Sequence, residues 1–161
     1  MSDFHFVMPT GSTSLAGGAI ADFTESGTVS DVVSMAKYET AYFIVHWGVG
    51  TTGTATITAI PCNDADKSAT TTAIPFEYKR VSAVETNTAW TASSSLATTA
   101  GSQQVYVIKV KAQDLPVVSG NVYEYVYLNI AELVNAALLG GCIIMMADPR
   151  FNEATLDAVT A

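Results

Sequence analysis

From residue 28 onward the chain alternates apolar and polar side chains with a period of two, which is the pattern of half-buried β-strands. Thr, Val, Ile and Tyr, the residues that favour extended backbone, are abundant in this stretch. Segments rich in Gly, Pro, Asn, Asp and Ser separate the alternating runs and indicate turns. We therefore predict about seven strands, at residues 28–34, 42–47, 54–62, 73–82, 104–111, 122–130 and 138–147.

The same alternation predicts which side chains of a strand face the core. In the strands at 54–62 and 104–111 these are Ala55, Ile57, Ala59, Tyr106, Ile108 and Val110. Residues 43–45 and 143–146, by contrast, are apolar at every position, as expected for strands that are central in a sheet or covered by another subunit. The pattern as a whole predicts an all-β fold, a single β-sandwich.

The first 18 residues differ from this β-rich part, because they contain Pro9, several glycines and many small hydroxylated residues. An isolated apolar cluster lies near their start and consists of Phe4, Phe6, Val7 and Met8. We expect residues 1–18 to form a flexible N-terminal arm that becomes ordered when its apolar tip finds a partner. Residues 19–161 then form the β-sandwich domain and end in a short C-terminal tail.

Two segments lack a regular strand pattern. Residues 85–102 are rich in Thr, Ala and Ser around Trp90, and we expect a long loop or a weak edge hairpin there. Residues 131–139 have a composition that a short helix ended by Gly140 and Gly141 would allow. We favour a hairpin at 131–139, with the glycines admitting a close backbone neighbour.

The net charge is −8, from 15 acidic and 7 basic residues. The basic residues are scattered apart from Lys79-Arg80 and Lys109/Lys111, whereas nucleic acid or an anionic membrane surface would require clustered cations. The longest apolar run, at 136–147, is shorter than the roughly 20 residues that span a bilayer. Residues 1–9 carry no Lys or Arg and no apolar stretch follows them, so we expect no signal peptide and folding in a cytoplasm. Neither nucleic acid nor a membrane is an expected partner.

Cysteine and histidine are too few to indicate a metal site. Cys62 and Cys142 lie in apolar segments far apart in the sequence, and we expect free buried thiols rather than a disulfide. A zinc site would need both cysteines together with His5 and His46, at spacings that fit no known ligand pattern. His46 lies in an apolar run beside Trp47, so we expect a satisfied histidine in or beside the core.

Two short motifs resemble ligand-binding loops but lack what the ligands need. Residues 48–53 spell G-x-G-x-x-G, yet an alternating strand follows them where a dinucleotide fingerprint requires a helix N-terminus. Residues 63–68 resemble the start of a calcium loop, but Ala69 and Pro75 stand where glycine and glutamate are required. No motif of a catalytic nucleophile or metalloprotease is present. We therefore expect no cofactor, no metal and no enzymatic activity.

Three tyrosines, Tyr123, Tyr125 and Tyr127, are spaced to share one face of the strand at 122–130. The opposite face carries Val122 and Val126, which suit a core. The tyrosine row is then exposed or half exposed in one subunit. Tyrosine combines a rigid apolar ring with a polar tip, so the row fits packing under a loop or second sheet, an interface between protein copies, or a platform for sugars.

Several segments together resemble small structural proteins of tailed bacteriophages, and are most similar to head decoration (cement) proteins. They are the hairpin at 51–57, Phe76-Glu77-Tyr78-Lys79-Arg80, the strands around 123–130, and the closing Ala147-Asp148-Pro149-Arg150-Phe151. The resemblance covers about residues 28–151. It implies a β-rich, non-enzymatic protein made in the host bacterial cytoplasm and bound in many copies to the outside of a capsid, with the major capsid protein as its partner. Pro149 departs from the expected pattern and leaves the role of the C-terminal tail open.

Three functions follow from these observations. The favoured one is a decoration protein that stabilises the capsid; a phage neck or tail-tube subunit, which would form a closed ring, is the second; a carbohydrate-binding β-sandwich that uses the tyrosine row is the third. We assign the apolar arm tip to the capsid and the tyrosine row to contacts between copies of the chain. Decoration proteins of the kind that this chain resembles often form trimers, so we expect a trimer.

Overall fold

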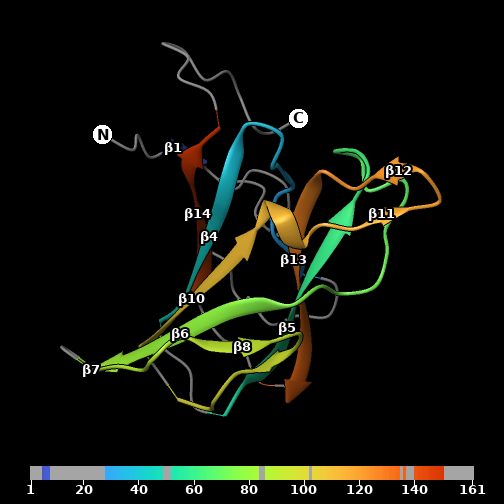
Figure 1. Cartoon of the computed structure of the whole chain (residues 1–161). Helices are drawn as coiled ribbons and strands as arrows, with labels where there is room; N and C mark the ends of the chain where they lie inside the picture. Colours follow the sequence, from blue (N-terminus) through green and yellow to red (C-terminus); the bar gives the residue numbers. More distant parts are fainter. Residues whose placement is uncertain are drawn as a thin grey trace.

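The computed structural model describes residues 5–7, 28–48, 52–83, 86–101, 103–134, 136 and 140–150. These residues form an almost entirely β structure, which confirms the predicted fold class (Figure 1). The strands are β1 (His5–Val7), β2 (Thr28–Val29), β3 (Val33–Ser34), β4 (Tyr38–Trp47), β5 (Thr54–Cys62), β6 (Phe76–Ala83), β7 (Thr86–Asn87), β8 (Thr91–Ser93), β9 (Leu96–Ala97), β10 (Gln104–Lys111), β11 (Val117–Val118), β12 (Asn121–Val122), β13 (Tyr125–Val134) and β14 (Gly140–Pro149). A single turn of 3₁₀ helix, η1 (Ala112–Asp114), follows β10.

Most of the strands form two large antiparallel sheets, and β11 and β12 form a separate two-stranded sheet. Sheet A has the order β1-β14-β4-β10-β6-β7, with β8 also paired to β6. Sheet B has the order β2-β13-β5-β9, with β3 also paired to β13. Six of the seven predicted strands correspond to the long strands β4, β5, β6, β10, β13 and β14, and the seventh, at 28–34, is divided into β2 and β3.

The strand pairing is nested. β1 pairs with β14, β2 and β3 pair with β13, β4 pairs with β10, and β5 pairs with β9. The chain is thus arranged as one long antiparallel hairpin, rolled up so that its successive limbs alternate between the sheets, which is the jelly-roll arrangement. Strands β6, β7 and β8 are an insertion between β5 and β9 that extends sheet A beyond β10.

The inner faces of the two sheets meet in one core. Phe43 and Val45 of sheet A are inaccessible to solvent, as is Leu128 of sheet B, and all belong to the same cluster of buried side chains. The six side chains that the sequence assigns to the core on β5 and β10 are at most 1% exposed, which confirms the predicted faces. The period-two pattern therefore identifies the surface that holds the sandwich together.

The predicted hairpin at 131–139 is wrong. β13 continues to Val134 and belongs to sheet B, whereas β14 begins at Gly140 and belongs to sheet A. A hairpin would put both strands in one sheet, but here the chain crosses between sheets. The crossing places β14 against β4, where Ile144 is inaccessible to solvent in the core.

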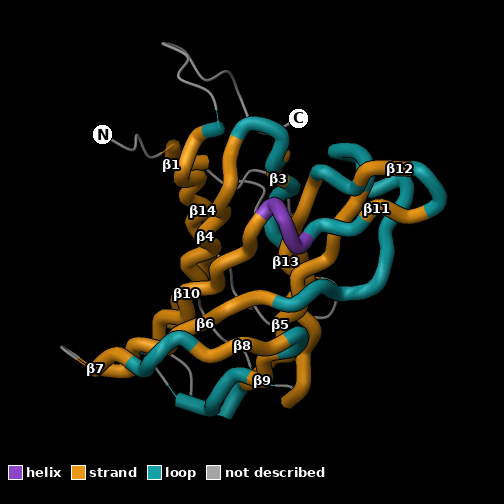
Figure 2. The backbone as a smooth tube through the Cα atoms, viewed as in Figure 1, coloured by secondary structure: helices purple, strands orange, loops and turns teal. Residues whose placement is uncertain are grey.

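The segment at 85–102 crosses the edge of the sandwich. β8 pairs with β6 of sheet A, and β9 pairs with β5 of sheet B. Leu96 of β9 is 5% exposed and belongs to the core. The tube in Figure 2 follows this path from β7 through β8 to β9.

A short hairpin of β11 and β12 extends away from both sheets (Figures 1 and 2). Its turn consists of Ser119 and Gly120, whose φ angles are 53° and 83°. Positive φ at both central residues is the geometry of the tight type I′ turn, whose twist matches that of the strands it joins. Val122 lies in this hairpin and is 60% exposed, so its predicted place in the core is wrong.

The different burial of neighbouring positions on β10 predicts a difference in stability. Ile108→Ala leaves a cavity between the sheets and is expected to lower the free energy of unfolding by about 2–5 kcal/mol. Val107→Ala, one position along on the outer face, is expected to lower it by about 1 kcal/mol or less. Urea unfolding followed by far-ultraviolet circular dichroism measures both, and equal losses would contradict the assignment of the two faces.

Candidate assembly surfaces

The outer face of sheet A carries a continuous, largely apolar surface, which we call the sheet A face. It consists of Tyr42, Ile44, Val105, Val107, Ile143, Met145 and Trp90, with Lys79, Lys109 and Lys111 among them. Cross-strand pairing places Ile143, Ile44 and Val107 in one row across β14, β4 and β10. Ile143 is 43% exposed, and the other two are partly exposed. The sandwich therefore leaves this apolar row uncovered.

Trp90 is held against the sheet A face by three neighbours. The Lys79 ammonium lies 5.1 Å from the Trp90 ring centroid, and the Lys109 ammonium lies 4.8 Å from it. The Tyr42 ring lies beside the same indole, with the two ring centroids 6.4 Å apart. Cations over the face of an indole are attracted by its electron density, which orients the ring before any partner binds. Trp90 nevertheless remains 41% exposed.

Glu77 is an acidic residue of the same surface, and it pairs with two of its lysines. Lys109 forms an ion pair with the Glu77 carboxylate, and the Lys111 Nζ lies 4.0 Å from Glu77 Oε2. The hydrogen bond from Lys109 is the main cause that lowers the pKa of the Glu77 carboxyl. Asp114 lines the same hollow as Glu77, Lys109 and Lys111. Three lysines then stand with two carboxylates, which leaves the surface with a small net positive charge.

His46 lies on this outer face and is exposed, so its predicted place in or beside the core is wrong. The alternation of β4 directs its side chain outward, between the inward-facing Val45 and Trp47. Its imidazole covers Gly141 on the neighbouring strand, where a Cβ atom added to the glycine would come within 2.8 Å of the ring carbon Cε1. The glycine thus admits a close neighbour, but the neighbour is a side chain rather than backbone.

Two of the four predicted arm residues fall within a described strand. Phe6 and Val7 belong to β1, whose backbone pairs with Met145 and Ile144 of β14. Phe4 and Met8 lie outside the described residues. The start of the chain therefore adds an edge strand to sheet A of its own subunit, next to the sheet A face. The predicted contact of the arm with a capsid stays a prediction.

The predicted tyrosine row is interrupted. Tyr125 and Tyr127 are partly exposed on the outer face of sheet B, whereas Tyr123 is only 8% exposed and lines a cavity with Met35 and Leu115. Tyr123 precedes β13, and the chain changes its parity between Tyr123 and the buried Val126. The Lys67 ammonium lies 4.9 Å from the Tyr127 ring centroid. A pair of tyrosines, rather than a row of three, is available on this face.

Sequence reasoning missed the projecting hairpin as a surface. Val117 is 65% exposed and pairs with Val122, which is 60% exposed, while Val118 is 39% exposed. The β-pattern of these valines indicates a strand, but it does not distinguish a core strand from a two-stranded projection. An isolated two-stranded ribbon is marginally stable in water, so exposed valines here favour a contact with another surface.

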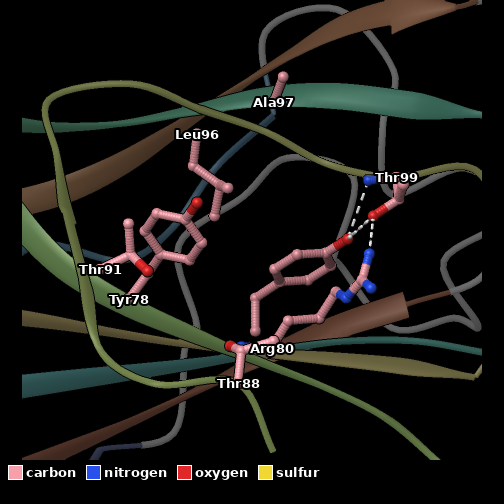
Figure 3. Close-up of a pocket in the computed structure, with 8 residues that line it drawn as sticks. Tyr78, Arg80, Thr88, Thr91, Leu96, Ala97 and Thr99 are labelled. Atoms are coloured by element: carbon pink, nitrogen blue, oxygen red, sulfur yellow. Dashed lines mark hydrogen bonds between the residues drawn. The ribbon is translucent and has the colours of Figure 1, made fainter.

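A cavity of about 170 Å³ opens at the edge of the sandwich, between β6, β10 and residues 88–99 (Figure 3). Figure 3 shows the Arg80 guanidinium reaching Thr99, to whose hydroxyl it donates a hydrogen bond. The backbone N–H of Thr99 donates to the Tyr106 hydroxyl at 2.9 Å, and that hydroxyl donates to Gln104 Oε1 at 2.7 Å. These polar groups bond to one another, which ties the segment after β9 to β6 and β10 of sheet A.

The two cysteines are free and buried, as predicted, and lie on different sheets. Burial raises the pKa of Cys142 to about 12. Burial, assisted by the negative charge of Asp64, raises the pKa of Cys62 to about 11. The fold therefore does not place Cys62 and Cys142 on neighbouring strands, where a disulfide between them could form.

The calcium-like turn is closed by its own hydrogen bonds. The Asp64 carboxylate accepts the backbone N–H of Ser68 at 2.8 Å, and Lys67 has a positive φ of 57°. Within the described ranges, no group of three or more His, Cys, Asp or Glu side chains could hold a metal ion. Strand β5 begins at Thr54, directly after Gly53, where the sequence predicts a strand rather than a helix; residues 49–51 of the predicted turn lie outside the described residues.

Among the helices of the described part of the chain, none has the length and apolar character needed to cross a membrane. Comparison of the sequence and structure with protein-family models, curated proteins and solved structures gave no match.

The raised pKa values predict slow reaction of both thiols in the folded protein, because the thiolate is the reactive form. At pH 8, alkylation of Cys62 and Cys142 is expected to be slow until a denaturant unfolds the chain, as measured by mass spectrometry. Because folding raises both pKa values, the unfolded state loses its protons first as pH rises. The free energy of unfolding should therefore fall above about pH 9, and fall less in a Cys62→Ala/Cys142→Ala variant. Rapid labelling of the native protein at pH 8 would contradict the predicted slow reaction of the two thiols.

The Tyr106 hydrogen bonds predict a stability difference between the two tyrosines of the cavity. Tyr106→Phe leaves the Gln104 Oε1 atom and the Thr99 N–H without the tyrosine hydroxyl as their partner and is expected to cost about 1–3 kcal/mol. Tyr78→Phe removes a hydroxyl for which the described residues give no hydrogen bond, so it serves as the matched control. Thermal unfolding of both variants tests this, and a Tyr106→Phe protein as stable as the control would refute the role of the network.

Proposed function

We propose that this chain is a non-enzymatic structural protein of a virion that binds the outside of a tailed-phage capsid and stabilises the shell. The observation that carries the proposal is the apolar surface on the outside of sheet A. β4 and β14 are apolar on both faces, and the sandwich buries only the inner one. Exposed apolar surfaces of this kind mark binding to other proteins.

The topology supports the proposal by analogy. Jelly rolls occur in viral capsid proteins, and also in lectins and in other binding and enzymatic proteins. An all-β fold is also what the proposed resemblance of residues 28–151 to phage structural proteins implies.

The start of the chain supports a role in assembly as well. β1 is a strand of three residues at the edge of sheet A, paired with the middle of β14. The sheet A face begins at that strand, so an arm that binds the capsid would do so beside an apolar surface. We propose that the arm tip and the sheet A face are directed towards the shell, and that Tyr125 and Tyr127 serve contacts between copies, in a trimer.

The alternatives predict different behaviour in solution. A neck or tail-tube subunit would form closed rings without any capsid. A carbohydrate-binding module would use Tyr125 and Tyr127 to stack a sugar ring, although Tyr123 is buried and is lost to such a platform. A glycan array that shows specific binding, lost in Tyr125→Ser, would favour the sugar-binding function over the capsid one.

Deletion of residues 2–14 tests the capsid proposal. The deleted protein should keep its β-sandwich, because the core lies between β4 and β14 of sheet A and the strands of sheet B, but should lose occupancy on capsids examined by cryo-electron microscopy. Tyr125→Ser should leave capsid binding in place and weaken the contacts between copies, measured by sedimentation. Full occupancy of capsids by the deleted protein would contradict the assignment of the arm to the capsid. Failure of the intact protein to bind capsids would contradict the proposed function.

A further inference from the structure

We infer that the sheet A face, centred on Trp90, is the surface that contacts the shell, and that the contacted surface of the shell protein is acidic around an apolar patch. This inference rests on the proposed function and deepens it, because it names the residues of the contact and the chemistry of the partner.

Trp90 has the properties of a central anchor. Tryptophan is among the residues that contribute most to protein interfaces, above all where surrounding contacts exclude water. Here Lys79, Lys109 and Tyr42 orient the ring before binding. A side chain that is already ordered loses little conformational freedom when a partner covers it, which favours affinity.

The distribution of charge gives the chemistry of the partner. The chain has 15 acidic and 7 basic residues, yet three of the seven basic side chains, Lys79, Lys109 and Lys111, lie on the one face that carries Trp90. Glu77 and Asp114 are the acidic side chains beside them, so the lysines outnumber the carboxylates by one. An acidic protein is therefore positive on the one face that is also broadly apolar. The complementary surface carries carboxylates around an apolar centre.

The position of the face relative to other surfaces favours the shell over a second copy. Two copies paired face to face through this surface would place lysines against lysines, which disfavours a two-fold contact here. In the proposed trimer, the contacts between copies are assigned to Tyr125 and Tyr127 instead. The sheet A face is also continuous with β1, the strand that contains Phe6 and Val7 of the arm. Tyr125 and Tyr127 lie on the other sheet, so contacts between copies can be changed without touching this face.

The test measures binding of purified full-length protein to capsids that lack it. Lys79→Glu/Lys111→Glu is expected to weaken binding by at least about tenfold, because like charges then face the acidic shell surface. Lys79→Arg/Lys111→Arg keeps the charges and should bind as the unchanged protein does. Trp90→Ser should also lose at least about tenfold. Leu133→Ser is the matched control, because Leu133 is 58% exposed on β13 of the opposite sheet and belongs to neither proposed contact, and it should keep its affinity for the capsid.

Two further readouts separate docking from a loss of folding. The affinity of the unchanged protein should fall as salt is added, and the Glu variant should lose this dependence. Trp90 is 41% exposed and Trp47 is 2% exposed, so acrylamide quenching of the free protein reports on Trp90 and should decrease on the capsid. Circular dichroism confirms that each variant is folded.

The outcomes are distinguishable. If the intact protein binds capsids and the Glu and Ser variants bind equally well, or if Trp90 stays open to acrylamide on the capsid, this inference is overturned while the proposed function stands. If the variants separate copies of the chain but bind capsids unchanged, the occupant of the face is a second copy and the inference is wrong. If the intact protein does not bind capsids, the proposed function and the inference fail together.

Discussion

Strand β4 presents apolar side chains on both of its faces, and a sandwich of two sheets can bury only one of them. The inner face, with Phe43 and Val45, packs against sheet B and forms the core. The nested pairing places β4 between β14 and β10, so the outer side chains of three neighbouring strands join into one surface. The burial that stabilises the fold therefore also produces the exposed surface. Polar residues at Ile44 or Ile143 would have been compatible with the same fold, so their apolar character points to a requirement outside the single subunit.

The insertion between β5 and β9 adds two features to this plan. β6 extends sheet A and brings Lys79 and Glu77 beside β10. β8 follows Trp90 and pairs with β6, which holds the indole over the lysines of the face. β9 then returns to sheet B, and the bonds from Arg80 through Thr99 to Tyr106 fix the returning segment. The segment from β7 to β9 therefore closes one edge of the sandwich and also supplies Trp90 to the outer face of sheet A.

The alternation of the sequence predicts the strands and their inner faces because both depend on neighbouring residues. It places Tyr106 and Ile108 correctly, and it marks residues 43–45 as apolar on both faces. It fails where the outcome depends on distant parts of the chain. The turn at Ser119 and Gly120 creates a separate hairpin, which exposes Val122 and turns Tyr123 inward. The chain crosses between sheets after Val134, and Trp90 lies on the sheet A face. Both features depend on which strands pair, and a local pattern carries no information about pairing.

Charge determines how such a chain would approach an acidic surface. With a net charge of −8, most orientations of the protein are repelled, and repulsion grows as the separation falls below the screening length. The orientation that presents Lys79, Lys109 and Lys111 is the exception, because it brings positive charge to the nearest point of contact. Long-range electrostatic attraction then favours the approach of this face. At short range, the apolar side chains of β4 and β14 on the same face favour binding. Because both effects favour one face, an acidic protein can bind an acidic partner in one orientation and still resist association through its other surfaces.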